Sequence, residues 1–341
     1  MKTMKMTTPQ KFDNSICRPV GGFSLVELMV AMLISLLLMA GVVQIFAGTK
    51  DTFLSQEGNS RLQENARFAL SRLSEDISAA GHLGCLDSAA PVDPFFNDLA
   101  NKAIGSSYDF SSPMFGTDGG GIISDTISIR RSGGSGGGAI RLLQEMSSSI
   151  SDLQLEQNSA YNSLQQFDVL VVGDCGTASV FMITNDPTIS GGTIKHAAGV
   201  VATSGPNIGQ SNISGDLQNK FGTQDGSVAG VTLVGTATYE LCNSTSGNGT
   251  SLFLNSNNCA DATAANELVE GVQDMQILYG IDADAVPGVE QYLRADQVGF
   301  AQWNSIASVR MTLVFDNVQN VPDRVYTRSF TTTVRLRNRG G

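Results

Sequence analysis

The stretch Gly21-Gly22-Phe23-Ser24-Leu25-Val26-Glu27-Leu28 joins a basic N-terminal segment to a long apolar run. From Phe23 to Gly48, Glu27 is the only residue with a formal charge. A bilayer strongly disfavours a buried carboxylate, so one near the start of a membrane-competent helix needs a partner or a function. The sequence therefore predicts that this segment both directs the chain to the membrane and takes part in assembly.

The flanks of this stretch indicate its orientation. Residues 1–22 carry four basic side chains and one acidic side chain, and they lack the small-residue cleavage site of an ordinary secretory signal. Positive charge before a hydrophobic span keeps that end in the cytoplasm. An apolar run of about 24 residues forms a helix roughly 36 Å long, enough to cross a bilayer. We expect a transmembrane helix over residues 23–48 with a cytoplasmic N-terminus; a plain signal anchor with an incidental Glu27 is the alternative.

Residues 49–81 are polar overall but keep a helical period. Their apolar side chains recur at three- and four-residue steps, at Leu62, Ala66, Ala69, Leu70, Leu73, Ile77 and Ala80. Charged residues, Asp76 among them, fill much of the remaining face. This pattern predicts an amphipathic helix whose apolar stripe packs on another element. Gly81 is a stop signal, and Gly48 and Gly58 are points at which the helix could bend.

From about residue 82 the chain consists of short β-type runs separated by Gly, Ser, Asn and Asp. The runs that best fit strands are 126–130, 167–172, 179–184, 231–234, 237–242, 251–254, 306–315 and 325–336. The last two alternate apolar and polar residues and predict a hairpin-like antiparallel pair. The expected fold is α+β, with the long N-terminal helix packed on an antiparallel β-sheet domain with long loops. Residues 82–341 would form a periplasmic globular domain.

Three segments of this domain are interpreted from composition. Residues 131–138 are expected to be a flexible glycine-rich loop, and residues 185–230, with few aromatic residues, a long surface excursion. Residues 140–146 are a candidate helix. The formal net charge is −11, and removal of residues 1–22 makes the chain more acidic. Such a body is a poor general binder of nucleic acid, and no specific nucleic-acid partner is predicted.

The cysteines indicate an oxidising compartment. Of five cysteines, Cys17 lies before the apolar run, which leaves an even set of Cys85, Cys175, Cys242 and Cys259. An even set in a translocated domain predicts two disulfides, although four cysteines allow three connectivities. We favour Cys242 with Cys259, because a polar loop separates them, and Cys85 with Cys175 by elimination. A structural zinc site is the weaker alternative, since no C-x-x-C pair occurs.

Signals for catalysis are poor. Residues 133–137 match the nucleophile-elbow pattern, but any Ser in a glycine-rich run does so. Nothing singles out His196 as a base, and only His82 accompanies it. Asp282 and Asp284 lack the rest of a calcium loop and are expected to form a solvated turn. The sequence predicts no catalytic residue, no cofactor and no metal ligand, hence no enzyme.

The junction of Gly22 and Phe23, with Glu27 as the fifth residue of the apolar helix, resembles the class III signal of type IV prepilins and type II secretion pseudopilins. The resemblance implies that prepilin peptidase removes residues 1–22 and methylates the new amino terminus of Phe23. The leader is longer than is usual, and Met4 or Met6 is an alternative start. In a stack of staggered helices, Glu27 of one chain can face the Phe23 amine of another, so that two charges costly in an apolar environment neutralise each other.

The C-terminal third also resembles a family. Residues 267–280, Tyr292, Trp303, 309–311 and 330–338 are similar to the W-type minor pilins of type IV pili. The same residues also read as the best strands, with Tyr279 and Trp303 as apolar anchors. The resemblance implies a minor pilin that initiates pilus assembly and enters the fibre near its tip, in support of twitching motility, adhesion or DNA uptake. The implied partners are other minor pilins, the major pilin, the inner-membrane assembly platform and a large tip adhesin.

Two other functions remain open. A J-type pseudopilin of type II secretion shares the signal but is usually smaller. A signal-anchored periplasmic enzyme is the third, and it would need a catalytic set that the sequence does not offer.

Overall fold

The computed structural model describes residues 22–83, 95–120, 123–132, 138–174, 176–222, 229–247, 249–283, 288–316 and 327–337. Predictions that concern residues 1–21, Cys85, Cys175, the loop 133–137 and Asp284 lie outside these residues. The chain forms two compact units, Met1–Gln56 and Glu57–Gly341.

Helix α1 (Leu25–Ser78) contributes to both units and continues through Gly48 and Gly58. From Leu25 to Phe53 every residue is exposed. Among the described residues this is the one helix long and apolar enough to cross a membrane. Because the apolar side chains cover all sides of this part, the helix offers no solvated face of its own and requires an apolar environment.

The part of α1 in the second unit buries the apolar stripe that the sequence predicts. The buried apolar residues of this stripe are Leu62, Ala66, Ala69, Leu73 and Ile77, each at most 4% exposed. The helix ends at Ser78, and Gly81 adopts a left-handed φ of 73°. The Gly81 N–H donates to the carbonyl of Arg130, 2.8 Å away, so the glycine both stops the helix and attaches its end to a strand.

The second unit contains mostly short β-strands and single turns of 3-10 helix. The first strands are β1 (Phe95–Asn97), β2 (Met114–Thr117), β3 (Thr126–Ser132), β4 (Ile140–Arg141), β5 (Leu153–Gln154), β6 (Val169–Gly173), β7 (Ala178–Met182) and β8 (Thr193–Ile194). The later strands are β9 (Gly230–Asn243), β10 (Thr250–Leu254), β11 (Glu267–Glu270), β12 (Val272–Ile281), β13 (Gln291–Leu293), β14 (Ile306–Asp316) and β15 (Thr327–Arg335). The 3-10 turns are η1 (Tyr161–Ser163), η2 (Pro187–Ile189), η4 (Ala295–Gln297) and η5 (Phe300–Ser305).

The described strands form two larger sheets and a small one. The first sheet has the order β1-β7-β6-β9-β10-β11, with β3 and β4 also paired to β9 and β2 paired to β3. The second has the order β13-β12-β14-β15, and β5 pairs with β8. The pairings between the described strands are antiparallel except that of β1 with β7. The long strand β9 therefore links most of the first sheet.

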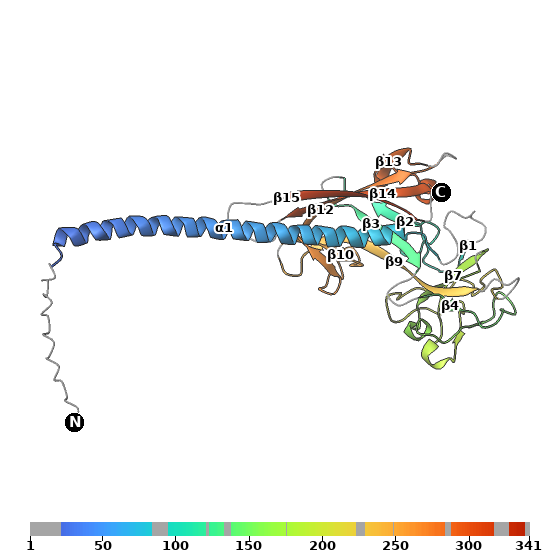
Figure 1. Ribbon diagram of the computed structural model, residues 1–341. Helices are drawn as coiled ribbons and strands as arrows, with labels where there is room; N and C mark the ends of the chain where they lie inside the picture. The colour runs from blue at the N-terminus through green and yellow to red at the C-terminus, as the bar shows by residue number, and fades with distance from the viewer. Residues whose placement is uncertain are drawn as a thin grey trace, which may run out of the picture. The chain divides into compact units, whose positions relative to one another are not determined.

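The main hydrophobic core lies between the later part of α1 and both larger sheets. Leu73 and Ile77 of the helix share a cluster with Ile127 of β3, Leu252 of β10 and Met275 of β12. Figure 1 shows this part of α1 running along the same strands. Two further clusters lie around β6 and β7, on either face of the first sheet. The prediction of a long helix packed on a β domain is confirmed.

The C-terminal sheet has the anchors and the hairpin-like pair that its sequence predicts. The ring of Trp303 lies 4.9 Å from that of Tyr279 and 4.8 Å from that of Phe115, centroid to centroid. Strands β14 and β15 pair antiparallel from Ser308↔Arg335 to Asp316↔Thr327. Aromatic contacts of this kind add to burial and fix how the sheet lies on its neighbours.

Three expectations about local structure are wrong. The runs 231–234 and 237–242 belong to a single strand, because Gly235 pairs with Arg131 of β3 and does not break the ladder. The candidate helix at 140–146 begins as the short strand β4 instead. The segment 185–230 is not a surface excursion, since Leu217 and Phe221 within it are fully buried. This segment has few regular elements, but its irregularly spaced apolar residues still fill a core. Composition alone does not indicate such burial.

Candidate functional site

The first candidate site is the amino-terminal end of α1. Gly22 and Phe23 precede the helix, and Glu27 lies in its first turn, where a carboxylate also suits the helix dipole. Phe23 is 79% exposed. Within the described residues, no hydrogen bond or ion pair involves the Glu27 side chain. This end of the chain therefore presents an apolar surface and an uncompensated charge to whatever surrounds it.

Three hydroxyl side chains on this part of α1 form hydrogen bonds within the helix. Ser35 donates to the carbonyl of Ala31 at 2.8 Å, and Thr49 and Thr52 bond to the carbonyl four residues earlier in the same way. Such bonds remove the need for water in an apolar environment. The Glu27 carboxylate has no such internal partner among the described residues.

The second site fixes the other end of α1. Asp76 is fully buried and its carboxylate forms an ion pair with Arg131 of β3, at 2.8 Å. Tyr239 of β9 donates its hydroxyl to the same carboxylate at 2.7 Å, and Arg72 lies 3.8 Å away. A buried carboxylate is tolerated when it is paired and hydrogen-bonded in this way. We call these four residues the helix clamp.

The electrostatics of the helix clamp follow from this geometry. Burial, together with the hydrogen bond to Asp76, raises the pKa of Tyr239, so the phenol remains a donor. Partial burial alone would lower the pKa of Arg72, but the charge of Asp76 and its neighbours outweighs it, and the pKa is raised. Both groups thus stay in the forms that stabilise the Asp76 carboxylate.

Sequence reasoning missed the helix clamp because it placed Asp76 on the solvated face. The stripe positions Ala69, Leu73 and Ala80 are separated by steps of four and seven residues, and position 76 falls on the same line. A charged residue on an apolar stripe is the signal that could have identified it. Its partners come from strands far away in the sequence and carry no local signal of their own.

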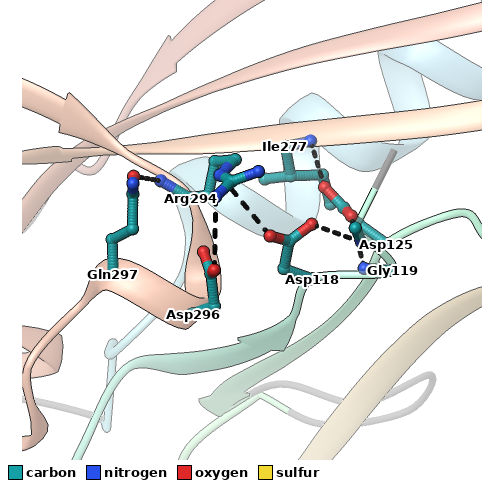
Figure 2. Close-up of polar contacts among 8 residues, drawn as sticks. Asp118, Gly119, Asp125, Ile277, Arg294, Asp296 and Gln297 are labelled. Atoms are coloured by element: carbon teal, nitrogen blue, oxygen red, sulfur yellow. Dashed lines mark hydrogen bonds and ion pairs between the residues drawn. The ribbon is translucent and has the colours of Figure 1, made fainter. Parts of the chain in front are cut away.

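The third site joins the two larger sheets (Figure 2). Asp125, just before β3, accepts a hydrogen bond from Ile277 N of β12 at 2.7 Å and from Gly119 N at 3.0 Å. Arg294, before η4, lies 3.5 Å from Asp118 and 3.3 Å from Asp296. We call Asp118, Asp125, Arg294 and Asp296 the sheet clamp, because its carboxylates connect the loop between β2 and β3 to the C-terminal sheet.

The two central carboxylates of the sheet clamp are shifted in opposite directions. A backbone hydrogen bond from Gly120, together with Arg294, holds the pKa of Asp118 below its usual value despite burial. Burial raises the pKa of Asp125, and the nearby charge of Asp118 adds to this, although the bonds from Gly119 and Ile277 oppose it. The pair therefore favours one ionised and one more readily protonated carboxyl group.

A disulfide joins Cys242 at the end of β9 to Cys259, with the Cα atoms 5.6 Å apart. This is the pairing favoured from the sequence. Among the described residues, Glu240, Cys242 and Cys259 also form one group with the spacing of metal ligands. Since both sulfur atoms belong to the disulfide, they are not available as thiolate ligands.

His196 has a structural environment. It is 3% exposed, its Nε2 lies 3.0 Å from the carbonyl oxygen of Ser151, and its ring meets Phe181 edge-on at 5.5 Å. A histidine enclosed in this way has no access to a substrate, so its surroundings suit a packing role. Asp282 accepts a hydrogen bond from Gly288 N at 3.2 Å, as in an ordinary turn.

Comparison with known families gives two matches. The model of the prokaryotic N-terminal methylation motif matches residues 17–43, which include Gly22, Phe23 and Glu27. The model of the type IV pilus-assembly protein W matches residues 238–336, which include all four strands of the C-terminal sheet. Searches of curated proteins and of solved structures find no match.

A methylation motif on an exposed apolar helix, continued by a helix stripe packed on a β domain, defines a pilin related to type IV pili. Within that class, residues 238–336 are similar to the type IV pilus-assembly protein W. The matched residues include Tyr239 of the helix clamp and Arg294 of the sheet clamp. The family resemblance thus extends to residues that fix the helix and the sheets.

Proposed function

We propose that this chain is a minor pilin that helps to initiate type IV pilus assembly and is incorporated near the tip of the fibre. The observation that carries the proposal is the unpartnered Glu27 on an exposed apolar helix, in a chain whose C-terminal sheet matches the pilus-assembly protein W. A helix of this kind is completed by similar helices of other subunits. Other minor pilins and the major pilin are the partners that supply them.

Processing comes first. Prepilin peptidase cuts between Gly22 and Phe23 and methylates the new amine, while the apolar helix holds the precursor in the inner membrane. The location of the junction supports this, because Gly22 and Phe23 lie outside the helix that begins at Leu25 and have no regular secondary structure. The globular unit then lies in the periplasm.

Docking follows. The new amine of Phe23 is positive, and in an apolar environment it costs free energy unless it is paired. Glu27 offers the complementary charge, and its lack of a partner within the described residues leaves it free to pair with a neighbouring subunit. One such pair per contact also specifies the stagger of adjacent helices, because only one register brings the two charges together.

The size of the second unit, Glu57–Gly341, favours a terminal position. A regular helical fibre repeats one subunit at close spacing, and a body this large would crowd its neighbours. A scarce subunit at the tip meets no such limit on its outer side. This argument favours an initiator or cap over a shaft subunit.

The experiment is deletion of the gene, followed by measurement of sheared surface fibres and of the membrane pool of major pilin. The proposal predicts a sharp loss of fibres with an unchanged membrane pool, and co-purification of the tagged protein with other minor pilins. Normal piliation in the deletion strain would contradict the initiator role. Loss of secreted proteins with normal piliation would instead favour a type II secretion pseudopilin.

A further inference from the structure

A polar groove of about 890 Å³ lies on the second unit, and its lining includes Thr238 and Glu240, the neighbours of Tyr239 on β9. Its floor is formed by β9, with Thr236, Thr238 and Glu240. One wall contains Tyr108 and Asn207, and residues of the loop 255–266 form another wall. The volume falls within the range of about 300–1,000 Å³ that is usual for small-ligand sites.

The wall that contains Tyr108 is held in place by a buried cation. Arg130 of β3 is 1% exposed and donates to Ser112 Oγ at 2.9 Å and to the carbonyl of Ser106 at 2.7 Å. Burial lowers the pKa of Arg130 to about 10, which still leaves it charged at neutral pH. The hydroxyl of Tyr108 donates to Asn207 Oδ1 at 3.2 Å, so the two residues at the rim are fixed to each other.

The wall formed by the loop 255–266 is held in an uncommon backbone conformation. Asn255, Asn257, Asn258 and Cys259 all have φ between 52° and 64°, in the left-handed region. The disulfide from Cys259 to Cys242 fixes this loop to the end of β9. Backbone strain of this kind persists only where surrounding structure enforces it. The groove therefore has two preorganised walls, which lowers the entropic cost of binding a ligand.

Several polar atoms on the groove have no partner within the described residues. Glu240 is only 3% exposed; its Oε1 accepts from Ser256 Oγ at 2.6 Å and Asn258 N at 3.1 Å, but no contact involves Oε2. Asp168 accepts from Gln165 N through Oδ2 at 2.8 Å and leaves Oδ1 without a contact. The Asn258 amide likewise has no side-chain contact. These carboxylate and amide atoms line the groove without a partner from the described residues, so a ligand in the groove can offer them hydrogen bonds.

The lining excludes some ligands. The described residues of the groove include no Lys, Arg or His, so a phosphate, sulfate or nucleic acid would meet carboxylates and no cation. The free groups instead combine carboxylate acceptors with amides, which both donate and accept, beside the Tyr108 ring. Each hydroxyl of a sugar also both donates and accepts. We propose that this groove binds a neutral saccharide, so that the body of this pilin is itself a glycan-binding module.

The test uses the full mature chain in a detergent that has no sugar head group, because glycoside detergents would compete. Maltotriose, cellotriose and chitotriose are titrated by calorimetry and by saturation-transfer NMR, with dextran sulfate and spermine as charged probes. At least one neutral trisaccharide is expected to bind with a dissociation constant of about 1 mM or tighter. Dextran sulfate and spermine are expected to bind more weakly than the best trisaccharide.

Two variants locate the site. Glu240→Gln keeps the size of the side chain, and Asn258→Gly removes the amide while tolerating φ of 53°. Each is expected to weaken binding about tenfold, since each removes a hydrogen bond to a buried or preorganised group. The matched controls lie outside the groove: Glu156→Gln makes the same charge change, and Gln218→Gly replaces another left-handed residue, with φ of 64°.

The outcomes are distinct. Binding that both groove variants weaken and both controls retain supports the proposal. Failure of all three trisaccharides to bind at 10-fold the expected dissociation constant overturns it, as does equal binding by the groove variants. Tighter binding of spermine than of any trisaccharide overturns it in favour of a cationic ligand. None of these results depends on piliation, so the proposed assembly function stands or fails separately.

Discussion

The two parts of helix α1 each carry a carboxylate, and the environments of these two carboxylates are opposite. In the second unit, Asp76 is fully buried and is paired with Arg131 and Tyr239 of its own chain. In the first unit, Glu27 has no partner among the described residues, on a helix that exposes its apolar side chains. The difference teaches that the fold completes the later part of α1 and leaves the earlier part for lipid and other subunits.

This comparison explains why the same helix serves stability and assembly. The later part is stabilised by burying its stripe against two sheets, and its charge is compensated within the chain. The earlier part contributes nothing of this kind to its own unit. Substitutions in the later part should therefore change the stability of the body, and substitutions in the earlier part should change processing and entry into fibres.

The largest effect is expected at the junction. Gly22→Arg places a bulky charged side chain where the peptidase must bind the extended backbone, so cleavage should fail and full-length precursor should accumulate in the inner membrane. Intact mass and N-terminal sequencing of the membrane fraction measure this. The unchanged chain should begin at Phe23 in the same assay. A mature chain that begins elsewhere would contradict the prepilin-type processing.

The next largest effect tests the helix clamp. Asp76→Ala should destabilise the body by about 3 kcal/mol or more, because it removes the buried carboxylate that pairs with Arg131 and accepts the hydrogen bond of the Tyr239 hydroxyl. Glu75→Ala is the matched control: Glu75 is 74% exposed and lies 3.6 Å from Arg72, so its loss should cost less than about 1 kcal/mol. Urea unfolding of both variants measures this difference. Equal unfolding midpoints for the two variants would contradict a stabilising role of the helix clamp.

A smaller effect separates two buried tyrosines. Tyr239→Phe removes a hydroxyl that donates to Asp76 and should cost about 1.5–3 kcal/mol. Tyr279→Phe removes a buried hydroxyl that has no hydrogen-bond partner among the described residues, so it should be close to neutral or stabilising. Thermal unfolding of the pair provides the measurement. A larger loss of thermal stability in Tyr279→Phe than in Tyr239→Phe would contradict this assignment of the two hydroxyl groups.

The smallest effect is a dependence on pH at the sheet clamp. The pKa of Asp125 is raised, so its proton stabilises the fold at low pH, and this contribution is lost as pH rises from the usual value of 3.8 through the raised pKa. The pKa of Asp118 is lowered, so its contribution is present above 3.8 and is lost as pH falls through the lowered value.

Two variants check these signs by unfolding across pH. The stability difference between the unchanged chain and Asp125→Asn should shrink as pH rises above about 4, since asparagine does not titrate. The corresponding stability difference for Asp118→Asn should grow as pH rises through the acid range. If the stability difference changes with pH in the same direction for both variants, the two carboxylates do not act as the assigned pair.

The sequence predicts local features of this molecule well and long-range ones poorly. The stripe at Leu62, Ala69 and Leu73 follows from helical spacing, and the disulfide from Cys242 to Cys259 closes a loop that is polar in the sequence. Asp76 and Tyr239, by contrast, are 163 residues apart. No local pattern relates them, because the pairing depends on how β9 crosses the end of the helix.

Irregular segments limit the prediction in a different way. Phe167 was expected in a strand, but its φ of 73° is left-handed, and β6 begins only at Val169. Leu217 and Phe221 fill a core from a segment with little regular structure. The groove wall at Asn255–Cys259 belongs to the same class, since its left-handed backbone is set by the disulfide and by β9. The hydrophobic periodicity of the sequence does not predict the conformation of such positions.

The most direct test of the comparison is the amount of this protein in sheared fibres when Glu27 is changed. Glu27→Ala should be cleaved and should fold normally, because neither Gly22 nor the body is altered, yet its content in fibres should fall about tenfold or more, since a neighbouring amine would remain unpaired in an apolar environment. Glu27→Asp, which keeps the charge on a shorter side chain, should restore part of the loss. Incorporation of Glu27→Ala at the level of the unchanged chain would contradict the claim that Glu27 finds its partner in another subunit.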